Sequence, residues 1–431
     1  MDQFTHPDPA RRAALRGMAA AAAAGGIASL MPSSASAASA AKAAPVAFER
    51  PASVPGVQPF KVTVPQAALD DLKLRLSLAR WPEQATVPDW SQGVPLPRLQ
   101  ALVDYWQHSY DWRQAEARLN ALPQFTTRID GLDIHFLHVR SKHANALPMV
   151  LTHGWPGSVF EFLKVIGPLV DPTAHGGKEE DAFHVVIPSL PGYGFSGKPE
   201  AAGWGLPHIA RAWATLMRRL GYRKWVAQGG DWGAGVTTWL AKQHADGLAA
   251  VHLNLPILFP PPIEGEPDKD EQAAIAQLIA FDGGKSGYAK LQGTRPQTIG
   301  YALADSPVAQ AAWIYEKLAE WSDSGNDPES LLSRDEILDN ITLYWLTGTG
   351  ASSARLYAES FSTDFSPQKL DLPVAVSLFP GELYHPPRKW GERMYSKLYY
   401  WNEAARGGHF AAFEQPMLFT AELRRAFATI R

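Results

Sequence analysis

The chain has 431 residues, which is enough for two domains or for one large domain with insertions. Lys and Arg total 40 while Asp and Glu total 43, so the formal net charge of −3 offers no basic excess for binding nucleic acid. Hydrophobic residues make up 46% and charged residues 19%, so the bulk of the chain can build a core and is not disordered. Cysteine is absent, which excludes disulfides, thiolate metal centres and cysteine nucleophiles.

Residues 1–44 have the composition of an export signal. Arg11-Arg12 precedes an alanine-rich apolar run at 18–31, and triplets of small residues follow it, as is typical of a cleaved signal. The paired arginines resemble a twin-arginine signal, although Ala10 and Ala14 depart from that pattern. We expect cleavage within 37–44 and an exported protein, periplasmic or secreted. Whether the segment stays attached as a tether is left open, and no other stretch is long and apolar enough to span a membrane.

Residues 45–124 contain too few strands to form a sheet of their own. The segment 60–64 alternates like an edge strand, and Leu69, Leu72 and Leu76 fall on one face of a helix predicted at 67–79. A second helix is predicted for 99–119, with Tyr110 on its inner face. We therefore expect this region to wrap around the domain that follows it.

From residue 125 onward, apolar runs bounded by Gly and Pro alternate with helical stretches. This rhythm predicts an α/β fold with a doubly wound, mostly parallel sheet. A helical lid at 255–370 is expected to interrupt the core, which comprises 125–254 and 371–431. The predicted core elements are strands at 149–152, 184–187, 225–227, 250–253, 374–379 and 398–401, with a crossover helix at 209–220.

The strand predicted at 225–227 runs directly into Gly229-Gly230-Asp231-Trp232-Gly233. Small residues around a nucleophile at a tight strand-to-helix turn are typical of the nucleophile elbow of α/β-hydrolases. The candidate nucleophile is Asp231, and the alternative is a simple helix N-cap. A carboxylate nucleophile forms an ester, which water can hydrolyse at its carbonyl group.

A candidate oxyanion-hole loop follows the strand predicted at 149–152. It reads His153-Gly154-Trp155-Pro156-Gly157, and its alternative interpretation is a plain Gly-Pro turn. In α/β-hydrolases this loop supplies one backbone N–H to the oxyanion, and the residue after the nucleophile supplies another. The predicted donors are therefore the backbone N–H groups of Trp155 and Trp232.

A candidate base and a candidate acid complete the set. His409 stands in the glycine turn Gly407-Gly408 after the last predicted strand, and Glu382 follows the strand predicted at 374–379. The chain order Asp231, Glu382, His409 is the nucleophile, acid, base order of α/β-hydrolases. Four features that each follow a strand are more specific together than any one of them.

Together these motifs resemble those of the microsomal-type epoxide hydrolases, including the juvenile hormone epoxide hydrolases of insects. The resemblance covers the chain from about residue 60 onward, and Arg80-Trp81-Pro82 resembles the family's N-terminal region. It implies conversion of an epoxide to a vicinal diol through an ester on Asp231, with His409, oriented by Glu382, activating water. The matching runs are His153-Gly154-Trp155-Pro156-Gly157-Ser158, Pro191-Gly192-Tyr193-Gly194-Phe195-Ser196, 229–233 and 406–414.

The resemblance also implies two lid tyrosines that donate to the epoxide oxygen. They map onto Tyr288, in Ser286-Gly287-Tyr288, and onto Tyr357, which ends the run 352–357. Phenols suit this task because they can hydrogen-bond the ring oxygen and release a proton as it becomes basic. Packing in the lid is the alternative role for both, and Tyr301 and Tyr344 are the other candidates.

No cofactor or metal is expected, because the sequence has neither a His-x-x-x-His pair nor a dinucleotide glycine fingerprint after a strand. The expected partners are water and a small epoxide, apolar or aromatic in view of the 15 tryptophans. A haloalkane dehalogenase is the nearest alternative, although such enzymes usually place a polar residue at the position of Trp155. A non-catalytic ligand-binding protein on the same fold is the other alternative.

Overall fold

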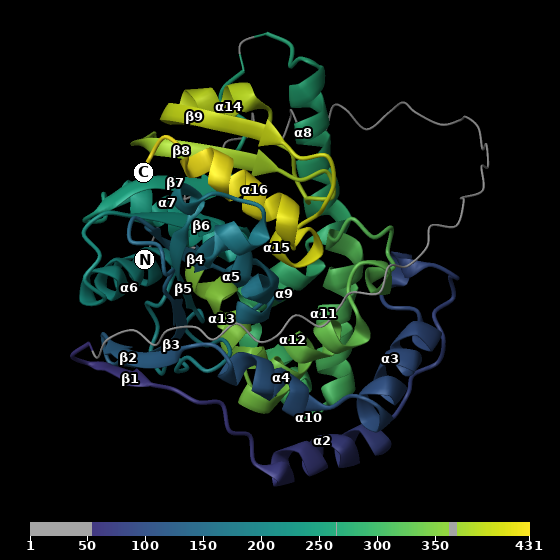
Figure 1. The fold of residues 1–431 in the computed structure, drawn as a ribbon. Helices are drawn as coiled ribbons and strands as arrows, with labels where there is room; N and C mark the ends of the chain where they lie inside the picture. Colours follow the sequence, from purple (N-terminus) through teal and green to yellow (C-terminus); the bar gives the residue numbers. More distant parts are fainter. Residues whose placement is uncertain (1–53, 264, 362–368) are drawn as a thin grey trace, which may run out of the picture. The chain divides into compact units, whose positions relative to one another are not determined.

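The computed structural model describes residues 54–263, 265–361 and 369–431, so the predicted export signal lies outside the described residues. The described chain forms a nine-stranded sheet in the order β1-β2-β3-β5-β4-β6-β7-β8-β9 (Figure 1). The strands are β1 Val57–Pro59, β2 Gln124–Ile129, β3 Leu132–Val139, β4 Leu147–Thr152, β5 Phe183–Pro188, β6 Trp225–Gly229, β7 Leu248–Leu253, β8 Leu370–Leu378 and β9 Tyr395–Glu403.

Helices surround this sheet, and those from α8 to α13 lie between β7 and β8 in the chain. Among the described residues, none of the helices combines the length and apolar character needed to cross a membrane. The helices are α2 Gln66–Ser77, α3 Leu96–His108, α4 Trp112–Asn120, α5 Leu163–Val170, α6 Leu206–Arg219, α7 Asp231–Lys242, α8 Lys269–Ala280, α9 Gly287–Thr294, α10 Pro296–Asp305, α11 Pro307–Trp321, α12 Arg334–Thr347, α13 Gly350–Phe361, α14 Arg388–Met394, α15 Ala411–Glu414 and α16 Pro416–Phe427.

The predicted doubly wound, mostly parallel sheet is confirmed. Strands β4 to β9 pair in parallel, and only the pairs β1–β2, β2–β3 and β3–β5 are antiparallel. Helices α5 and α16 pack together on one face of the sheet, while α6 and α7 pack on the other (Figure 1). The chain runs from β4 to β5 in one direction along the sheet and from β5 to β6 and β7 in the other. Right-handed crossovers in opposite directions place their helices on opposite faces. Because helices cover both faces of the sheet, β5 is buried at every position, and most of its residues are apolar.

The order of the strands brings the ends of β4 and β6 together. Thr152, the last residue of β4, pairs in register with Gly229, the last residue of β6. The chain leaves β4 toward β5 on one side and returns to β6 on the other, so this is the point where the strand order reverses. Open α/β sheets bind ligands at such a point, outside the carboxyl ends of the strands.

The edge strand predicted at 60–64 is wrong, because β1 ends at Pro59. Phe60 still donates its N–H to Gln124 O at 2.8 Å, but the pairing stops there. The side-chain amide of Asn120 then takes the place of a neighbouring strand. It accepts from Val62 N–H at 2.9 Å and donates to Val62 O at 2.8 Å.

The single helix predicted at 99–119 is also wrong, because two helices, α3 and α4, occupy this stretch. The break falls at 109–111, where the Asp111 side chain accepts from Arg113 N–H at 3.0 Å and caps the start of α4. Tyr110 therefore lies between the helices, and its buried hydroxyl donates to Asp339 Oδ1 of α12 at 2.8 Å.

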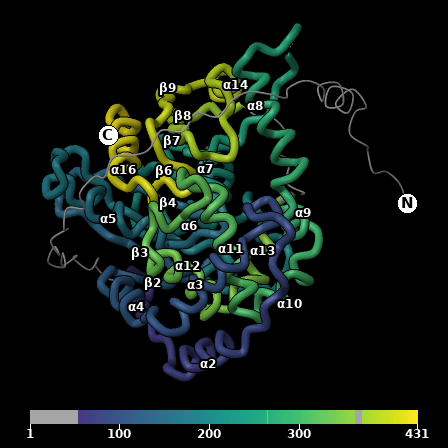
Figure 2. The backbone as a smooth tube through the Cα atoms, turned by 90° about the vertical axis from the view of Figure 1, so that its right-hand side faces the viewer, coloured from purple at the N-terminus to yellow at the C-terminus, as the bar shows by residue number. Residues whose placement is uncertain are grey.

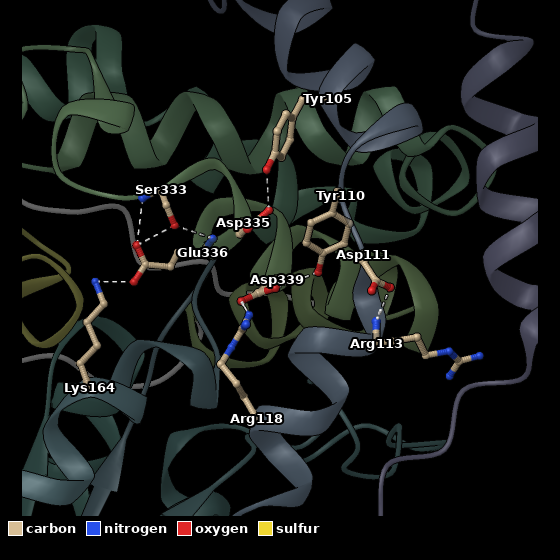
Figure 3. A network of polar contacts seen from close by, with 10 residues as sticks. All are labelled: Tyr105, Tyr110, Asp111, Arg113, Arg118, Lys164, Ser333, Asp335, Glu336 and Asp339. Atoms are coloured by element: carbon tan, nitrogen blue, oxygen red, sulfur yellow. Dashed lines mark hydrogen bonds and ion pairs between the residues drawn. The ribbon is translucent and has the colours of Figure 1, made fainter. Parts of the chain in front are cut away.

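The N-terminal helices pack against the helices inserted after β7. Helices α2 and α3 contact α11, and α3 and α4 contact α12, so the purple-blue and green segments lie side by side (Figure 2). Polar contacts fix α12 in this position (Figure 3). Asp339 accepts hydrogen bonds from Tyr110 and from Arg118, and Tyr105 OH donates to Asp335 at 2.9 Å.

Replacing Tyr110 with Phe should lower the free energy of unfolding by about 2 kcal/mol, because it removes a donor from a buried carboxylate. Tyr105→Phe is the matched control. It removes the same atom from a half-buried contact with Asp335, and should cost less than about 1 kcal/mol. Urea unfolding at pH 8 measures both values, and equal losses would contradict the importance given to Asp339.

The effect of Tyr110→Phe should also depend on pH. Burial raises the pKa of Asp339 to about 6, although Arg118 and the Tyr110 hydroxyl act in the opposite direction. The folded state therefore holds the Asp339 proton at pH values where the unfolded chain has released it, and the contribution of Asp339 to stability falls as the pH rises toward 6. The Tyr110 hydroxyl stabilises the charged carboxylate, so the loss in Tyr110→Phe should be full above pH 6 and should shrink toward pH 5.

Candidate active site

The turn between β6 and α7 places Asp231 at the carboxyl edge of the sheet. Asp231 is the first residue of α7, and its φ of 49° lies in the left-handed region that non-glycine residues seldom adopt. Gly233 makes the turn possible, because a Cβ there would lie 1.9 Å from Thr152 O at the end of β4. Such strain at a turn is typical of functional sites.

The loop after β4 binds the Asp231 carboxylate. Trp155 donates its backbone N–H to Asp231 Oδ1 at 2.8 Å. His153, which is buried, accepts from Leu190 N–H at 3.1 Å through Nε2, so it fixes the start of the loop. Trp232 follows Asp231 directly, and its ring lies against Tyr357 with centroids 4.7 Å apart. One oxygen of Asp231 is thus held, and the other is left to face the opposite side of the site.

His409 lies on that opposite side. Its Nε2 is 3.5 Å from Asp231 Oδ2, and its Nδ1 is 2.7 Å from Glu382 Oε1. The loops after β8 and β9 are joined by a parallel bridge between Gly381 and Gly408, which brings Glu382 and His409 together. The structure therefore places the predicted nucleophile, acid and base in one line of contacts.

The charge of His409 depends on its two carboxylate neighbours. Burial lowers the pKa of His409, but the charges of Glu382 and Asp231 and their hydrogen bonds outweigh burial and raise this pKa well above its usual value. The two carboxylates therefore favour the protonated form of the imidazole. Any change that removes the charge of Asp231 must lower the pKa of His409 again.

The two tyrosines predicted in the lid lie together over Trp155. The ring of Tyr288, on α9, stacks on Trp155 with centroids 5.1 Å apart, and Tyr357, on α13, meets Trp155 edge-on at 5.8 Å. The Tyr288 and Tyr357 centroids are themselves 5.8 Å apart. Burial, and then the charge of Asp231, raise the pKa of Tyr288 well above its usual value. Burial does the same for Tyr357, with the charges of Tyr288 and Asp231 adding to it.

The other two tyrosine candidates lie elsewhere. Tyr301 is 69% exposed on α10. Tyr344 is buried on α12, where its hydroxyl donates to Gly157 O at 2.7 Å. The structure thus brings Tyr288 and Tyr357, and neither Tyr301 nor the hydroxyl of Tyr344, into the group of aromatic rings around Trp155.

Comparison with known proteins assigns this chain to a family. The sequence pattern described as epoxide hydrolase N terminus matches residues 57–162. Over 379 residues the chain is 64% identical to a protein of Stigmatella aurantiaca whose epoxide hydrolase name is provisional, covering 87% of this chain and 86% of that one. It is 35% identical over 408 residues to Epoxide hydrolase 1 of Sus scrofa, covering 87% and 90%. The chain belongs to the microsomal-type epoxide hydrolase family.

The fold of this epoxide hydrolase family member agrees with that assignment. The pattern described as alpha/beta hydrolase fold matches residues 148–279. The structure of Aspergillus niger epoxide hydrolase superposes with a TM-score of 0.78 at 36% identity, covering 87% of this chain and 96% of that one. The predicted α/β-hydrolase fold is thus confirmed, and the chain is an enzyme of the class that hydrolyses ether bonds.

A second buried acid of the enzyme, Glu414, holds the turn that carries His409. Its Oε2 accepts from Gly408 N–H at 3.0 Å and from Asp323 N–H at 2.9 Å, and its Oε1 accepts from Phe410 N–H at 3.0 Å. The residues on both sides of His409 are thus fixed by one carboxylate. Glu414 lies inside the run 406–414, but nothing in that run indicates this role.

Asn340 and Tyr344 of α12 hold the loop that carries Trp155. Asn340 Nδ2 donates to Pro156 O at 2.7 Å, and Asn340 Oδ1 accepts from Ser158 Oγ at 2.7 Å. Tyr344 binds Gly157 O. The helices inserted between β7 and β8 therefore position the loop that carries Trp155 as well as the two tyrosines. No sequence signal links Asn340 to a loop so far away in the chain.

Replacing Asn340 with Ala should lower kcat about tenfold, because the Trp155 amide loses its support and small misplacements of donors are costly. Tyr344→Phe, which removes one contact instead of two, should have the smaller effect. Steady-state turnover of an epoxide measures kcat, and an unchanged kcat in Asn340→Ala would contradict this role.

Among the described residues, no group of three or more His, Asp and Glu side chains is arranged to hold a metal ion. The polar side chains of the site are instead paired with one another. His409 lies between Asp231 and Glu382, and Glu382 Oε1 also accepts from Leu383 N–H at 2.8 Å. This arrangement can supply a nucleophile, a base and hydrogen-bond donors.

Proposed function

We propose that this enzyme hydrolyses an apolar or aromatic epoxide to a vicinal diol through a covalent ester on Asp231. The observation that carries the proposal is the position of the Asp231 carboxylate between the Trp155 amide and His409 Nε2. Because Oδ1 is bound to the amide, Oδ2 is the oxygen free to attack carbon. Trp155, Trp232 and Trp321 surround the two tyrosines with aromatic surface, which favours an apolar substrate.

Ring opening is the first step. Asp231 Oδ2 forms a bond to one epoxide carbon, and the bond between that carbon and the ring oxygen breaks. Tyr288 and Tyr357 hydrogen-bond the ring oxygen and supply its proton, because an alkoxide is a stronger base than a phenolate. Their raised pKa values keep both phenols protonated before the reaction.

Ester hydrolysis is the second step. Esterification removes the negative charge of Asp231, and with it one of the groups that raise the pKa of His409. The imidazole, still oriented by Glu382, then returns its proton to the phenolate that ring opening left, becomes neutral, and takes a proton from the attacking water. The Trp155 and Trp232 amides stabilise the tetrahedral oxyanion, and each such donor is worth about 3–4 kcal/mol.

Single turnover tests this function. Excess protein is mixed with styrene oxide or an aliphatic epoxide, quenched in acid, and weighed intact. We expect a mass gain of one epoxide, located on the peptide that contains Asp231, and diol at later times. Asp231→Ala should show neither. Bromoalkanes serve as the comparison panel, and turnover of bromoalkanes in place of epoxides would indicate a dehalogenase.

We further propose that residues 1–44 export the enzyme by a twin-arginine-like route. The support is the sequence pattern of Arg11-Arg12 followed by an apolar run and small residues. Fractionation of the source cells should find the shortened chain outside the cytoplasm. Replacement of both arginines by lysine should retain the full-length chain inside, and export of this variant at the same level would contradict the twin-arginine route.

A further inference from the structure

A cavity of about 20 Å³ lies beside the Asp231 carboxylate, on the side of His409. Trp155, Glu161, Asp231 and His409 line it, while Tyr288 and Tyr357 do not. A cavity of this size holds about one water molecule, provided that polar groups surround it. The cavity is therefore too small for an epoxide and suited to a single water next to Asp231 Cγ, the carbonyl carbon of the ester.

Glu161 is the carboxyl group of this cavity that the proposed mechanism does not yet use. The amide side chains of Gln228 and Asn254 also line the cavity and are hydrogen-bonded to each other. It lies in the short 3₁₀ helix Val159–Phe162, directly after the oxyanion-hole loop. Its carboxyl group lies directly against Gly157, because a Cβ on residue 157 would lie 1.3 Å from Glu161 Oε1. The absence of a side chain at Gly157 thus provides the space that the Glu161 carboxyl fills.

The surroundings of Glu161 keep it neutral. Burial raises the pKa of Glu161 to about 8, with His409 lowering it and the charges of Asp231 and Glu414 raising it. At pH 7 the protonated form of this carboxyl group is therefore favoured, which avoids a third buried negative charge beside Asp231 and Glu414. A neutral carboxyl offers one carbonyl oxygen as an acceptor and one O–H as a donor.

We propose that this cavity binds the hydrolytic water and that the Glu161 carboxyl oxygen accepts one hydrogen bond from that water. The inference rests on the ester mechanism proposed above. The water oxygen forms a bond to the ester carbon, one water proton moves to His409 Nε2, and the other stays on the oxygen and faces Glu161. The bond to the diol oxygen then breaks, and that oxygen takes the proton from His409. Glu161 orients the lone pair of the water toward carbon.

The test separates the two steps in Glu161→Met and Glu161→Gln. Single turnover with styrene oxide gives the rate of ester formation from the mass gain and the rate of hydrolysis from its loss. Glu161→Met removes the acceptor, so hydrolysis should slow about 100-fold while ester formation stays within about threefold. Glu161→Gln keeps a neutral group with a carbonyl acceptor and an N–H in place of the O–H, so it should restore hydrolysis to within about fivefold of the wild-type rate.

A substitution at Gly157 tests the position of the Glu161 carboxyl without changing Glu161 itself. Gly157→Ala pushes the Glu161 carboxyl out of the cavity, so it should also slow hydrolysis, and adding it to Glu161→Met should cost little more. Hydrolysis at the wild-type rate in Glu161→Met would overturn the water site. Equal slowing in Glu161→Gln and Glu161→Met would also overturn the water site, because hydrolysis would then require a negative charge at position 161 and not a neutral acceptor. If the wild-type protein forms no ester, the proposed function itself fails; ester that forms but decays normally in Glu161→Met overturns the water site alone.

Discussion

Replacing His409 with Gln should stop turnover after the ester has formed. The variant lacks the base that activates water, so the rate of ester hydrolysis should fall about 10⁴-fold. Ester formation needs only Asp231 Oδ2 and the two phenols, so it should remain within about tenfold of the wild-type rate. The intact mass of the protein should rise by one epoxide and stay there, whereas the wild-type protein should return to its original mass.

Glu382→Gln is the graded control for this experiment. The amide oxygen can still accept from His409 Nδ1–H, which is 2.7 Å from the carboxylate in the wild-type protein, but the negative charge is gone. Hydrolysis should therefore be slower than in the wild type and faster than in His409→Gln. Diol formation at the wild-type rate in His409→Gln would show that another group activates water.

The sequence identifies the line from Asp231 through His409 to Glu382 because each of these residues follows a predicted strand. Parallel strands end at the same edge of a sheet, so residues that are far apart in the chain meet there. In this structure Thr152 pairs with Gly229 and Gly381 pairs with Gly408, so the loops that carry the three residues lie at the same edge. Their roles in the reaction remain predictions until the single-turnover experiments are done.

The hairpin of β2 and β3 could have been predicted from its turn residues, although its strands lack a clear apolar pattern. Asp130 and Gly131 form its turn with φ values of 48° and 83°, and an Asp-Gly pair is a strong hairpin signal. The flanking strands do not read as apolar runs, because His135 and His138 are buried in β3. His135 is accommodated by hydrogen bonds to Ser189 Oγ at 2.9 Å and Gln124 Oε1 at 3.1 Å.

Contacts between side chains distant in the chain could not be predicted. Two side-chain amides bind the backbone of distant segments. Asn120 binds Val62 beyond the end of β1, and Asn340 binds Pro156 in the loop after β4. A periodic pattern of apolar residues indicates neither contact. Glu161 gives no sequence signal either, since a single Glu among apolar residues is more often exposed. Such groups become visible only when the fold shows what surrounds them.

Replacing both Tyr288 and Tyr357 with Phe should slow ester formation about 10³-fold, because the opening ring oxygen then has neither a hydrogen-bond donor nor a source of its proton. Hydrolysis of ester that has already formed should stay within about threefold of the wild-type rate, since neither ring lines the cavity beside His409. The fall should therefore appear in the first step alone, as measured by mass gain after rapid quenching.

Tyr301→Phe is the matched control, because it removes the same atom from a side chain that is 69% exposed on the same lid, and it should leave both steps unchanged. Each single variant, Tyr288→Phe or Tyr357→Phe, should fall between the wild type and the double variant, because the remaining phenol still faces the oxygen. A double variant that forms ester at the wild-type rate would mean that the aromatic group over Trp155 only shapes the pocket. A double variant that is slowed equally in both steps would mean that the phenols support the fold of the lid rather than ring opening.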